Sequence, residues 1–282
     1  MAIPEWLLGP AGDLRPLPPM EMDVVNTVDR FGGVHTSISG GRTVDVLGFK
    51  SRYEIEIRYM EPEEYNRLEA LYTQQIPGPF YLVDPLRRNL VSRESSSARP
   101  SGTGFRGLST AGGALSWVKA SDSPLGWTKR AAEWHTIEAD NLVRFDHGRR
   151  IPLVSGRPII FSVYVNPSED VLLRARFQCY VGDQGAGTVS GEDTECPAGE
   201  WTRVTVTIPD TENYDEVSPE LQFISGGSAS TRVKILGAQA EYADEPTEAT
   251  LGGGSVLVAF EQMDTTSPYY PYQSVDLKLL EV

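Results

Sequence analysis

The sequence has few cysteines and histidines and no long hydrophobic run. Two cysteines in 282 residues cannot form a disulfide framework. We expect Cys179 and Cys196 either as one bridge or as two free thiols, and a small buried thiol is the more frequent fate of an isolated cysteine. The longest apolar stretches, such as residues 256–260, are far shorter than the roughly 20 residues of a membrane-spanning helix. The sequence therefore predicts no membrane span.

Catalytic and metal-ligating patterns are also missing. The sequence has no G-x-S-x-G, H-E-x-x-H, Walker A or G-x-G-x-x-G motif in the required context. None of its three histidines, His35, His135 and His147, has a partner at helical metal-ligand spacing. Carboxylates are so abundant that pairs arise by chance, which does not single out a glycosidase. We expect no catalytic residues, no cofactor and no assigned metal site, and leave open a calcium site in the acidic loops.

The charge balance restricts the partners of this protein. With 39 acidic and 25 basic residues the formal net charge is −14, so the chain should repel a phosphate backbone, and nucleic acid is a poor partner. The first eight residues have no basic segment followed by an apolar one, which predicts no secretory signal and folding in a cytoplasm. The 27 glycines and 20 prolines favour turns over helices.

The N-terminal part reads as a small α+β unit. Five prolines within residues 1–22 predict an extended arm and disfavour both a helix and a central strand. A hairpin is expected at 33–47 with its turn at 39–42, followed by an alternating strand at 53–59. Pro62, Glu63 and Glu64 begin a helix that ends near Gln75, and a strand follows at 80–83.

The central part reads as a β-sandwich. Residues 92–113 are rich in serine and glycine and are predicted to form a boundary. Beyond them, short strands with intervening turns are predicted at 134–138, 159–165, 172–181, 201–208, 221–224 and 232–241.

Two closing strands, 255–260 and 275–280, follow the glycine run 252–254. A lone hairpin buries too little apolar area to be stable, so these strands must pair elsewhere. We predict that residues 1–92 and 247–282 form one unit, and that residues 93–246 form an inserted sandwich. The predicted fold class is mainly β, with one helix in the first unit and a jelly-roll sandwich in the second.

Aromatic residues in the central part are the candidate binding residues. Sugars stack on exposed aromatic faces, and this makes Trp117, Trp127, Trp134, Tyr164 and Tyr180 candidates for carbohydrate binding. The alternative is packing in the core of the sandwich.

Two resemblances accompany these patterns. The segments Phe-Gly-Gly-Val-His at 31–35, residues 41–49, Glu-Glu-Tyr at 63–65 and Pro-Gly-Pro-Phe-Tyr at 77–81 within 77–85 resemble minor tail proteins of long-tailed actinobacterial bacteriophages, within the wider class of distal tail proteins. This resemblance implies a virion protein at the tail tip, assembled in the host cytoplasm as a ring, usually hexameric. Its partners would be copies of itself, the tail tube protein, the tail-tip hub and the tape measure protein.

The second resemblance concerns the central part. Residues 199–206 and 235–241 are similar to jelly-roll carbohydrate-binding modules, a resemblance that indicates the fold more than the ligand. Contact of the sandwich with host cell-wall glycans is a hypothesis that goes with it. Two hypotheses result. The leading one is a structural, non-enzymatic ring protein with an outward sandwich; the alternative is a soluble polysaccharide-binding protein or an accessory module of a cell-wall hydrolase.

Overall fold

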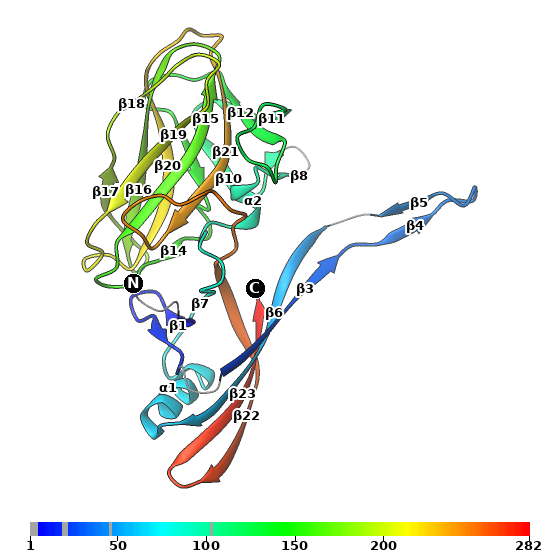
Figure 1. Cartoon of the computed structure of the whole chain (residues 1–282), viewed down its shortest axis with the longest axis vertical. Helices are drawn as coiled ribbons and strands as arrows, with labels where there is room; N and C mark the ends of the chain where they lie inside the picture. Colours follow the sequence, from blue (N-terminus) through cyan, green and yellow to red (C-terminus); the bar gives the residue numbers. More distant parts are fainter. Residues whose placement is uncertain (1–4, 19–21, 45–46, 102–103) are drawn as a thin grey trace. The chain divides into compact units, whose positions relative to one another are not determined.

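The computed structural model describes residues 5–18, 22–44, 47–101 and 104–282. These residues form two compact units. The end unit comprises Glu5–Pro10, Arg15–Leu82 and Val256–Val282, and the sandwich unit comprises Ala11–Leu14 and Val83–Ser255. Strands predominate in both (Figure 1), so the prediction of a mainly β chain is confirmed.

One seven-stranded sheet, in the order β2-β1-β7-β22-β23-β6-β3, forms the end unit. In it, β23 lies antiparallel to β6, with Leu277 opposite Ile55 and Leu279 opposite Tyr53. The closing hairpin therefore shares a sheet with strands from the N-terminal part. The strands are β1 (Leu7–Pro10), β2 (Arg15–Pro16), β3 (Met22–Phe31), β6 (Gly48–Met60), β7 (Phe80–Val83), β22 (Ser255–Tyr269) and β23 (Tyr272–Glu281).

A short hairpin of β4 (Val34–Thr36) and β5 (Arg42–Val44) lies between β3 and β6 along the chain. Figure 1 shows it extending from the ends of those two strands. The backbone N–H of Ser37 donates to the carbonyl of Gly41 at 2.7 Å, which closes the turn. The predicted hairpin is therefore confirmed, except that residues 45 and 46 lie outside the described part of the chain.

The helix α1 (Pro62–Tyr72) begins where the sequence predicts. Proline occupies its first turn, and the carboxylate of Glu64 accepts from the backbone N–H of Glu61 at 3.1 Å, so one exposed donor of the first turn is satisfied. Leu68 and Leu71 are buried in the hydrophobic core of the end unit. The helix is thus fixed by its apolar stripe as well as by its cap.

The proline-rich N-terminal arm forms a strand inside the sheet, which corrects the prediction that it could not. Strand β1 lies between β2 and β7. Pro10 is the last residue of β1, where its missing N–H interrupts the hydrogen-bond ladder least. Trp6 and Leu8 are buried in the end unit, so this part of the arm packs on its own chain.

Two antiparallel sheets form the sandwich unit. The first sheet has the order β10-β13-β20-β16-β17, with β14 paired to β20 and β18 to β16; the second has the order β11-β12-β21-β15-β19. The first comprises β10 (Leu108–Ala111), β13 (Leu142–Phe145), β14 (Ile151–Pro152), β16 (Val171–Val181), β17 (Gln184–Ser190), β18 (Thr194–Cys196) and β20 (Glu216–Gly226). The second comprises β11 (Ala114–Lys119), β12 (Arg130–His135), β15 (Ile159–Pro167), β19 (Thr202–Ile208) and β21 (Arg232–Glu241).

Aromatic side chains from both sheets meet in the core of the sandwich. Phe161 of the second sheet lies 5.2 Å from Phe145 and 6.1 Å from Phe177 of the first sheet, measured between ring centroids. All three are fully buried. Contacts of this kind hold two sheets face to face, and the predicted sandwich is confirmed.

The serine- and glycine-rich segment 92–113 is part of the sandwich unit, so the prediction of a boundary there is wrong. It contains the short helix α2 (Arg93–Ser96), β8 (Pro100–Ser101), β9 (Gly104–Phe105) and β10. The fully buried Asp146 accepts hydrogen bonds from the backbone N–H and the hydroxyl of Ser92, each at 2.6 Å, and from the hydroxyl of Ser95 at 2.5 Å. The serines therefore anchor this segment to the end of β13 rather than form a solvated linker.

Candidate functional site

The outer face of the first sheet carries a regular array of polar side chains. In β16 the core-facing residues Leu173, Ala175, Phe177 and Cys179 are fully buried, and partly exposed residues alternate with them. Because successive side chains of a strand point to opposite faces, the alternating positions face outward. These positions hold Arg174, Arg176, Gln178 and Tyr180 in β16, and Glu216, Ser218, Glu220 and Gln222 in β20. The arginines and Gln178 are partly exposed, whereas Tyr180 and the four β20 residues are buried.

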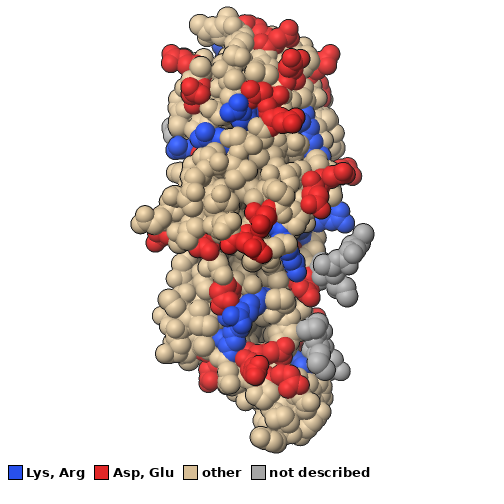
Figure 2. All heavy atoms as spheres, turned by 90° about the vertical axis from the view of Figure 1, so that its left-hand side faces the viewer, with Lys and Arg blue, Asp and Glu red and all other residues tan. Residues whose placement is uncertain are grey.

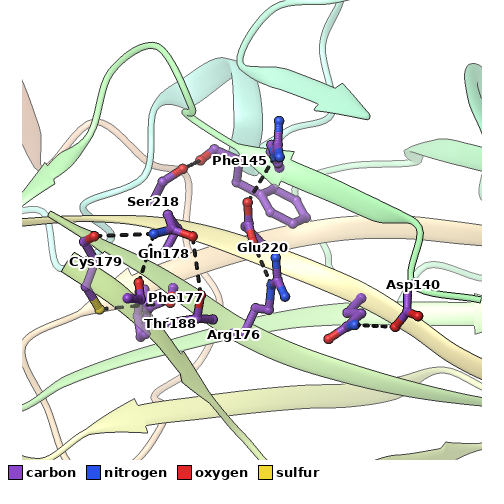
Figure 3. A network of polar contacts seen from close by, with 12 residues as sticks. Asp140, Phe145, Arg176, Phe177, Gln178, Cys179, Thr188, Ser218 and Glu220 are labelled. Atoms are coloured by element: carbon purple, nitrogen blue, oxygen red, sulfur yellow. Dashed lines mark hydrogen bonds and ion pairs between the residues drawn. The ribbon is translucent and has the colours of Figure 1, made fainter. Parts of the chain in front are cut away.

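A triad of two arginines and one glutamate occupies the middle of this face. Register places Arg144 of β13 and Arg176 of β16 on either side of Glu220 of β20. The Nε of Arg144 donates to Oε1 of Glu220 at 3.0 Å, and the Nε of Arg176 donates to Oε2 at 2.7 Å. Figure 3 shows Glu220 bonded to guanidinium groups on both sides. We call this group the Arg–Glu–Arg triad.

The three side chains of the triad differ in their exposure to solvent. The side chain of Glu220 is 2% exposed, whereas those of Arg144 and Arg176 are 31% and 19% exposed. A buried carboxylate needs compensation for its lost hydration, and the two charge-assisted hydrogen bonds supply it. The guanidinium groups thus lie between this carboxylate and solvent in fixed positions.

Carboxamide side chains on the same face are also held by hydrogen bonds. Gln178 donates to the carbonyl of Gly187 at 2.8 Å and accepts from the hydroxyl of Thr188 at 3.3 Å (Figure 3). Gln222 donates to the carboxylate of Asp140 at 2.9 Å. The planar groups of this face are therefore preorganised.

The aromatic residue on this face lies toward one end of β16. Tyr180 is 8% exposed, and the guanidinium carbon of Arg150 lies 3.8 Å from its ring centroid. Arg150 also donates to Glu216 at 2.9 Å. Partial burial lowers the pKa of Arg150, but the hydrogen bond to Glu216 and the negative charge of Glu216 raise it above its ordinary value. Arg150 is therefore a permanent cation that covers one face of Tyr180.

The second sheet presents a different outer face, because the chain itself covers it. Leu125 and Ala249 are buried there in a cluster with Leu236 of β21, and Tyr164 packs against the same cluster. Gly237 has a φ of +64°, in the left-handed region that favours glycine, and an added Cβ would lie 2.6 Å from the Leu125 side chain. Tyr164 is therefore partly enclosed by the protein's own chain rather than open to a ligand.

The five aromatic residues predicted from the sequence do not form one face. Trp134 is fully buried, with its ring edge-on to Phe223 at 6.4 Å, so it serves the core and is not available for stacking. Trp117 is 59% exposed in β11, the terminal strand of the second sheet, and Arg130 lies 5.8 Å from its ring.

Trp127 is 40% exposed, but its indole N–H donates to the carbonyl of Ala249 at 3.0 Å, which fixes it to the covered side of the second sheet. Of the five predicted residues, only Tyr180 lies on the outer face of the first sheet.

Sequence reasoning missed the polar residues of the first sheet, although a signal was present. The run from Leu173 to Tyr180 reads apolar, Arg, Ala, Arg, Phe, Gln, Cys, Tyr. Planar side chains therefore occupy every second position of this strand, on the face opposite the apolar one. The partners Arg144 and Glu220 belong to distant strands and could not be assigned from local pattern.

The two cysteines are both free thiols in the sandwich unit. Cys179 faces the core from one end of β16, whereas Cys196 in β18 pairs with Val171 at the other end of that strand. Burial raises the pKa of Cys179 to about 11 and that of Cys196 to about 12. The alternative of a bridge between them is therefore wrong.

Within the described ranges, no group of three or more His, Cys, Asp or Glu side chains is arranged to hold a metal ion. Over the same part of the chain, every helix is too short or too polar to cross a membrane.

Comparisons with known proteins identify similar folds only. No protein-family profile and no curated protein matches the sequence. The structure of TmCBM61 in complex with β-1,4-galactotriose is 15% identical, covers 55% of this chain and 99% of its own, and has a TM-score of 0.41. A xylan-binding domain from CBM 22 is 11% identical, covers 56% of this chain and 95% of its own, and has a TM-score of 0.40.

An enzymatically active domain of tailspike protein 4 from bacteriophage CBA120 is 12% identical over 55% of this chain and 21% of its own, with a TM-score of 0.40. These matches span the sandwich at low identity, and the predicted likeness to carbohydrate-binding modules stays a prediction. Any function must be argued from the residues of this chain.

Proposed function

We propose that this protein binds a polysaccharide on the outer face of the first sheet. The observation that carries the proposal is the row of guanidinium, carboxylate and carboxamide groups on that face, each held by hydrogen bonds within the protein. The outer face of the second sheet is instead covered by the loop that carries Leu125.

Planar polar groups suit sugar recognition. Neighbouring hydroxyls of a pyranose ring present oxygens at fixed spacing, which can accept from the fork of a guanidinium, and each hydroxyl can also pair with the donor or acceptor end of a carboxamide. Side chains already fixed by internal hydrogen bonds lose less conformational entropy on binding. Such a face recognises a ligand by orientation and does not itself supply a reaction.

Two predicted aromatic residues belong to the second sheet or its covered side and would form a separate contact, apart from the face proposed above. Trp117 is the most exposed tryptophan of the sandwich unit, and Trp127 keeps part of its ring accessible. Each offers a surface on which a sugar ring can stack. Trp134 is excluded by its burial.

Calorimetric titration of the full chain tests the proposal. The first probes are xylan and β-1,4-galactotriose, the ligands named for similar folds, together with soluble bacterial cell-wall glycans. Gln178→Ala and Gln222→Ala should each weaken binding by about fivefold, because each removes hydrogen bonds worth roughly 1 kcal/mol in total. Thr205→Ala in β19 of the second sheet is the matched control. Absence of binding to every glycan refutes the proposal.

A second candidate function is assembly into a homo-oligomeric ring, and one feature of the end unit favours it. Strand β3 is the terminal strand of the seven-stranded sheet, and apolar side chains are exposed along β3 and the adjoining hairpin: Val25 is 52% exposed, Phe31 50% and Val34 58%. Unpaired strand edges and exposed apolar residues are typical of association surfaces.

Under this second proposal, the chain is a structural protein of a phage tail tip, in a ring, usually hexameric, between the tail tube protein and the tail-tip hub, near the tape measure protein. Mass photometry of the full chain should then show a closed oligomer, and Val34→Asp should reduce it. A purely monomeric chain at all concentrations refutes this role and leaves the glycan-binding proposal intact.

A further inference from the structure

We propose that the Arg–Glu–Arg triad binds the carboxylate of a uronic acid residue within the polysaccharide. The inference rests on the proposed glycan-binding function and specifies its ligand. It assigns to this face an acidic sugar rather than a wholly neutral chain.

The charges of the triad do not cancel. Arg144 and Arg176 are both cations, and Glu220 supplies the single carboxylate that they share. The middle of the face therefore carries one surplus positive charge, although the whole chain has a formal net charge of −14. An anion placed over the two guanidinium groups completes the pairing that Glu220 begins.

The hydrogen-bonding capacity of the triad leads to the same conclusion. Two guanidinium groups have about ten N–H donors between them, whereas one carboxylate has about four acceptor sites. Even a fully saturated Glu220 therefore leaves about six donors, and guanidinium has no acceptor to offer a sugar hydroxyl. A ligand group that only accepts, as a carboxylate does, fits this surface better than a hydroxyl.

Burial places these donors where a ligand can approach. Glu220 lies beneath the guanidinium groups with its side chain 2% exposed, while Arg144 and Arg176 keep 31% and 19% of their side-chain surface. Strand β20 lies between β13 and β16, so the triad is at the centre of the sheet and not at its rim. Water is partly excluded there, which strengthens a charge-assisted contact.

Acidic groups flank the triad and restrict the ligand further. Two residues along the strands, Arg174 is already paired with Asp193 at 2.7 Å, and Gln222 donates to Asp140. Figure 2 shows acidic and basic side chains interspersed over the sandwich on the face it displays. The Arg174–Asp193 pair offers no surplus positive charge for a second carboxylate, and Asp140 would repel one, so the structure favours isolated uronates between neutral sugars.

The test compares two polymers that differ only in charge. Glucuronoxylan and the same preparation after reduction of its carboxyl groups are titrated into the full chain by calorimetry. The wild type should bind the acidic polymer at least about tenfold more tightly, as expected for charge-assisted hydrogen bonds. Added salt should weaken that binding and leave binding of the reduced polymer nearly unchanged.

Two variants and one control accompany the wild type. Arg176→Gln should abolish the preference for the acidic polymer. Glu220→Gln leaves both arginines but removes the negative charge and one of the two acceptor oxygens between them. It should therefore increase the preference, a gain that simple damage to the fold would not produce. Arg232→Gln, at an exposed arginine of β21 in the second sheet, should leave the preference unchanged.

The outcomes separate this inference from the function on which it rests. Equal binding of both polymers by the wild type, or an unchanged preference in Glu220→Gln, overturns the uronate assignment while glycan binding stands. If neither polymer binds, and the neutral probes named above do not bind either, both proposals fail. If Arg176→Gln does not fold, the comparison of wild type with Glu220→Gln still decides.

Discussion

Replacing Glu220 by glutamine measures how much the triad contributes to stability. The carboxylate accepts from two arginine Nε atoms, at 3.0 and 2.7 Å. Hydrogen bonds to charged groups contribute roughly 1.5–3 kcal/mol each, so the two bonds set an upper limit of roughly 3–6 kcal/mol. Arg144 and Arg176 are 31% and 19% exposed, so water can partly solvate them in the variant. We therefore expect a loss of about 2 kcal/mol in the free energy of unfolding.

The matched control is Glu133→Gln on the second sheet. Glu133 pairs with Arg232 at 3.3 Å, and the side chain of Arg232 is 56% exposed. Exposed pairs of this kind contribute roughly 0–1 kcal/mol. The two substitutions make the same chemical change, so the difference between them reports the burial of the glutamate and its second arginine.

Urea unfolding followed by tryptophan fluorescence is the assay. Four of the five tryptophans, Trp117, Trp127, Trp134 and Trp201, belong to the sandwich unit, so the signal reports mainly on that unit. With a urea dependence of roughly 2 kcal/mol/M, Glu220→Gln should lower the midpoint by about 1 M. A loss in Glu220→Gln no greater than that in Glu133→Gln would refute the reasoning that the triad is a buried, cooperative unit.

Three further predictions concern the sandwich unit. Burial raises the pKa of Asp146 above its ordinary value of 3.8, despite the hydrogen bonds that lower it. The stability contributed by the protonated side chain is therefore full below pH 3.8 and is lost as the pH rises through the raised pKa of the folded state. Unfolding measured across a pH series should show the wild type losing stability relative to Asp146→Asn, and parallel curves would contradict this. Trp134→Ala should lower the free energy of unfolding in urea by roughly 3–5 kcal/mol because the side chain is fully buried. Trp117→Ala should lower it by less than about 0.5 kcal/mol. Equal losses of stability in the two variants would show that the placement of the two rings is wrong. Cys179 and Cys196 are buried and their pKa values are raised, so a thiol reagent at neutral pH should label neither residue in the folded protein and both in urea, and rapid labelling of either in the folded state would contradict their burial.

Local patterns predicted those elements whose stability depends on residues close in the chain. The helix α1 was located from Pro62 and the glutamates that follow it, because its cap and first turn are formed by neighbouring residues. The strand β16 was located from its alternation, since one of its faces is buried along its whole length. Both interpretations required only a periodicity and a stop signal.

Errors arose where distant residues decide the outcome. Serines at 92–97 read as a linker by composition, but the buried carboxylate of Asp146 accepts from Ser92 and Ser95 and makes the segment part of the fold. Trp134 read as a candidate for sugar stacking, yet Phe223 from another strand buries it. In each case the partner lies far along the sequence, and composition does not reveal it.

The amino-acid sequence alone determined a mainly β chain with one capped helix, a central sandwich and no motif for catalysis, because hydrophobic period, turn residues and caps act over a few neighbouring positions. Tertiary structure alone decided which polar side chains share one face of the sandwich. Register across β13, β20 and β16 brings Arg144, Glu220 and Arg176 into one row, while a loop covers the other sheet. The residue type determines whether a side chain is charged, but its burial and its partners depend on strands that meet only in the folded chain.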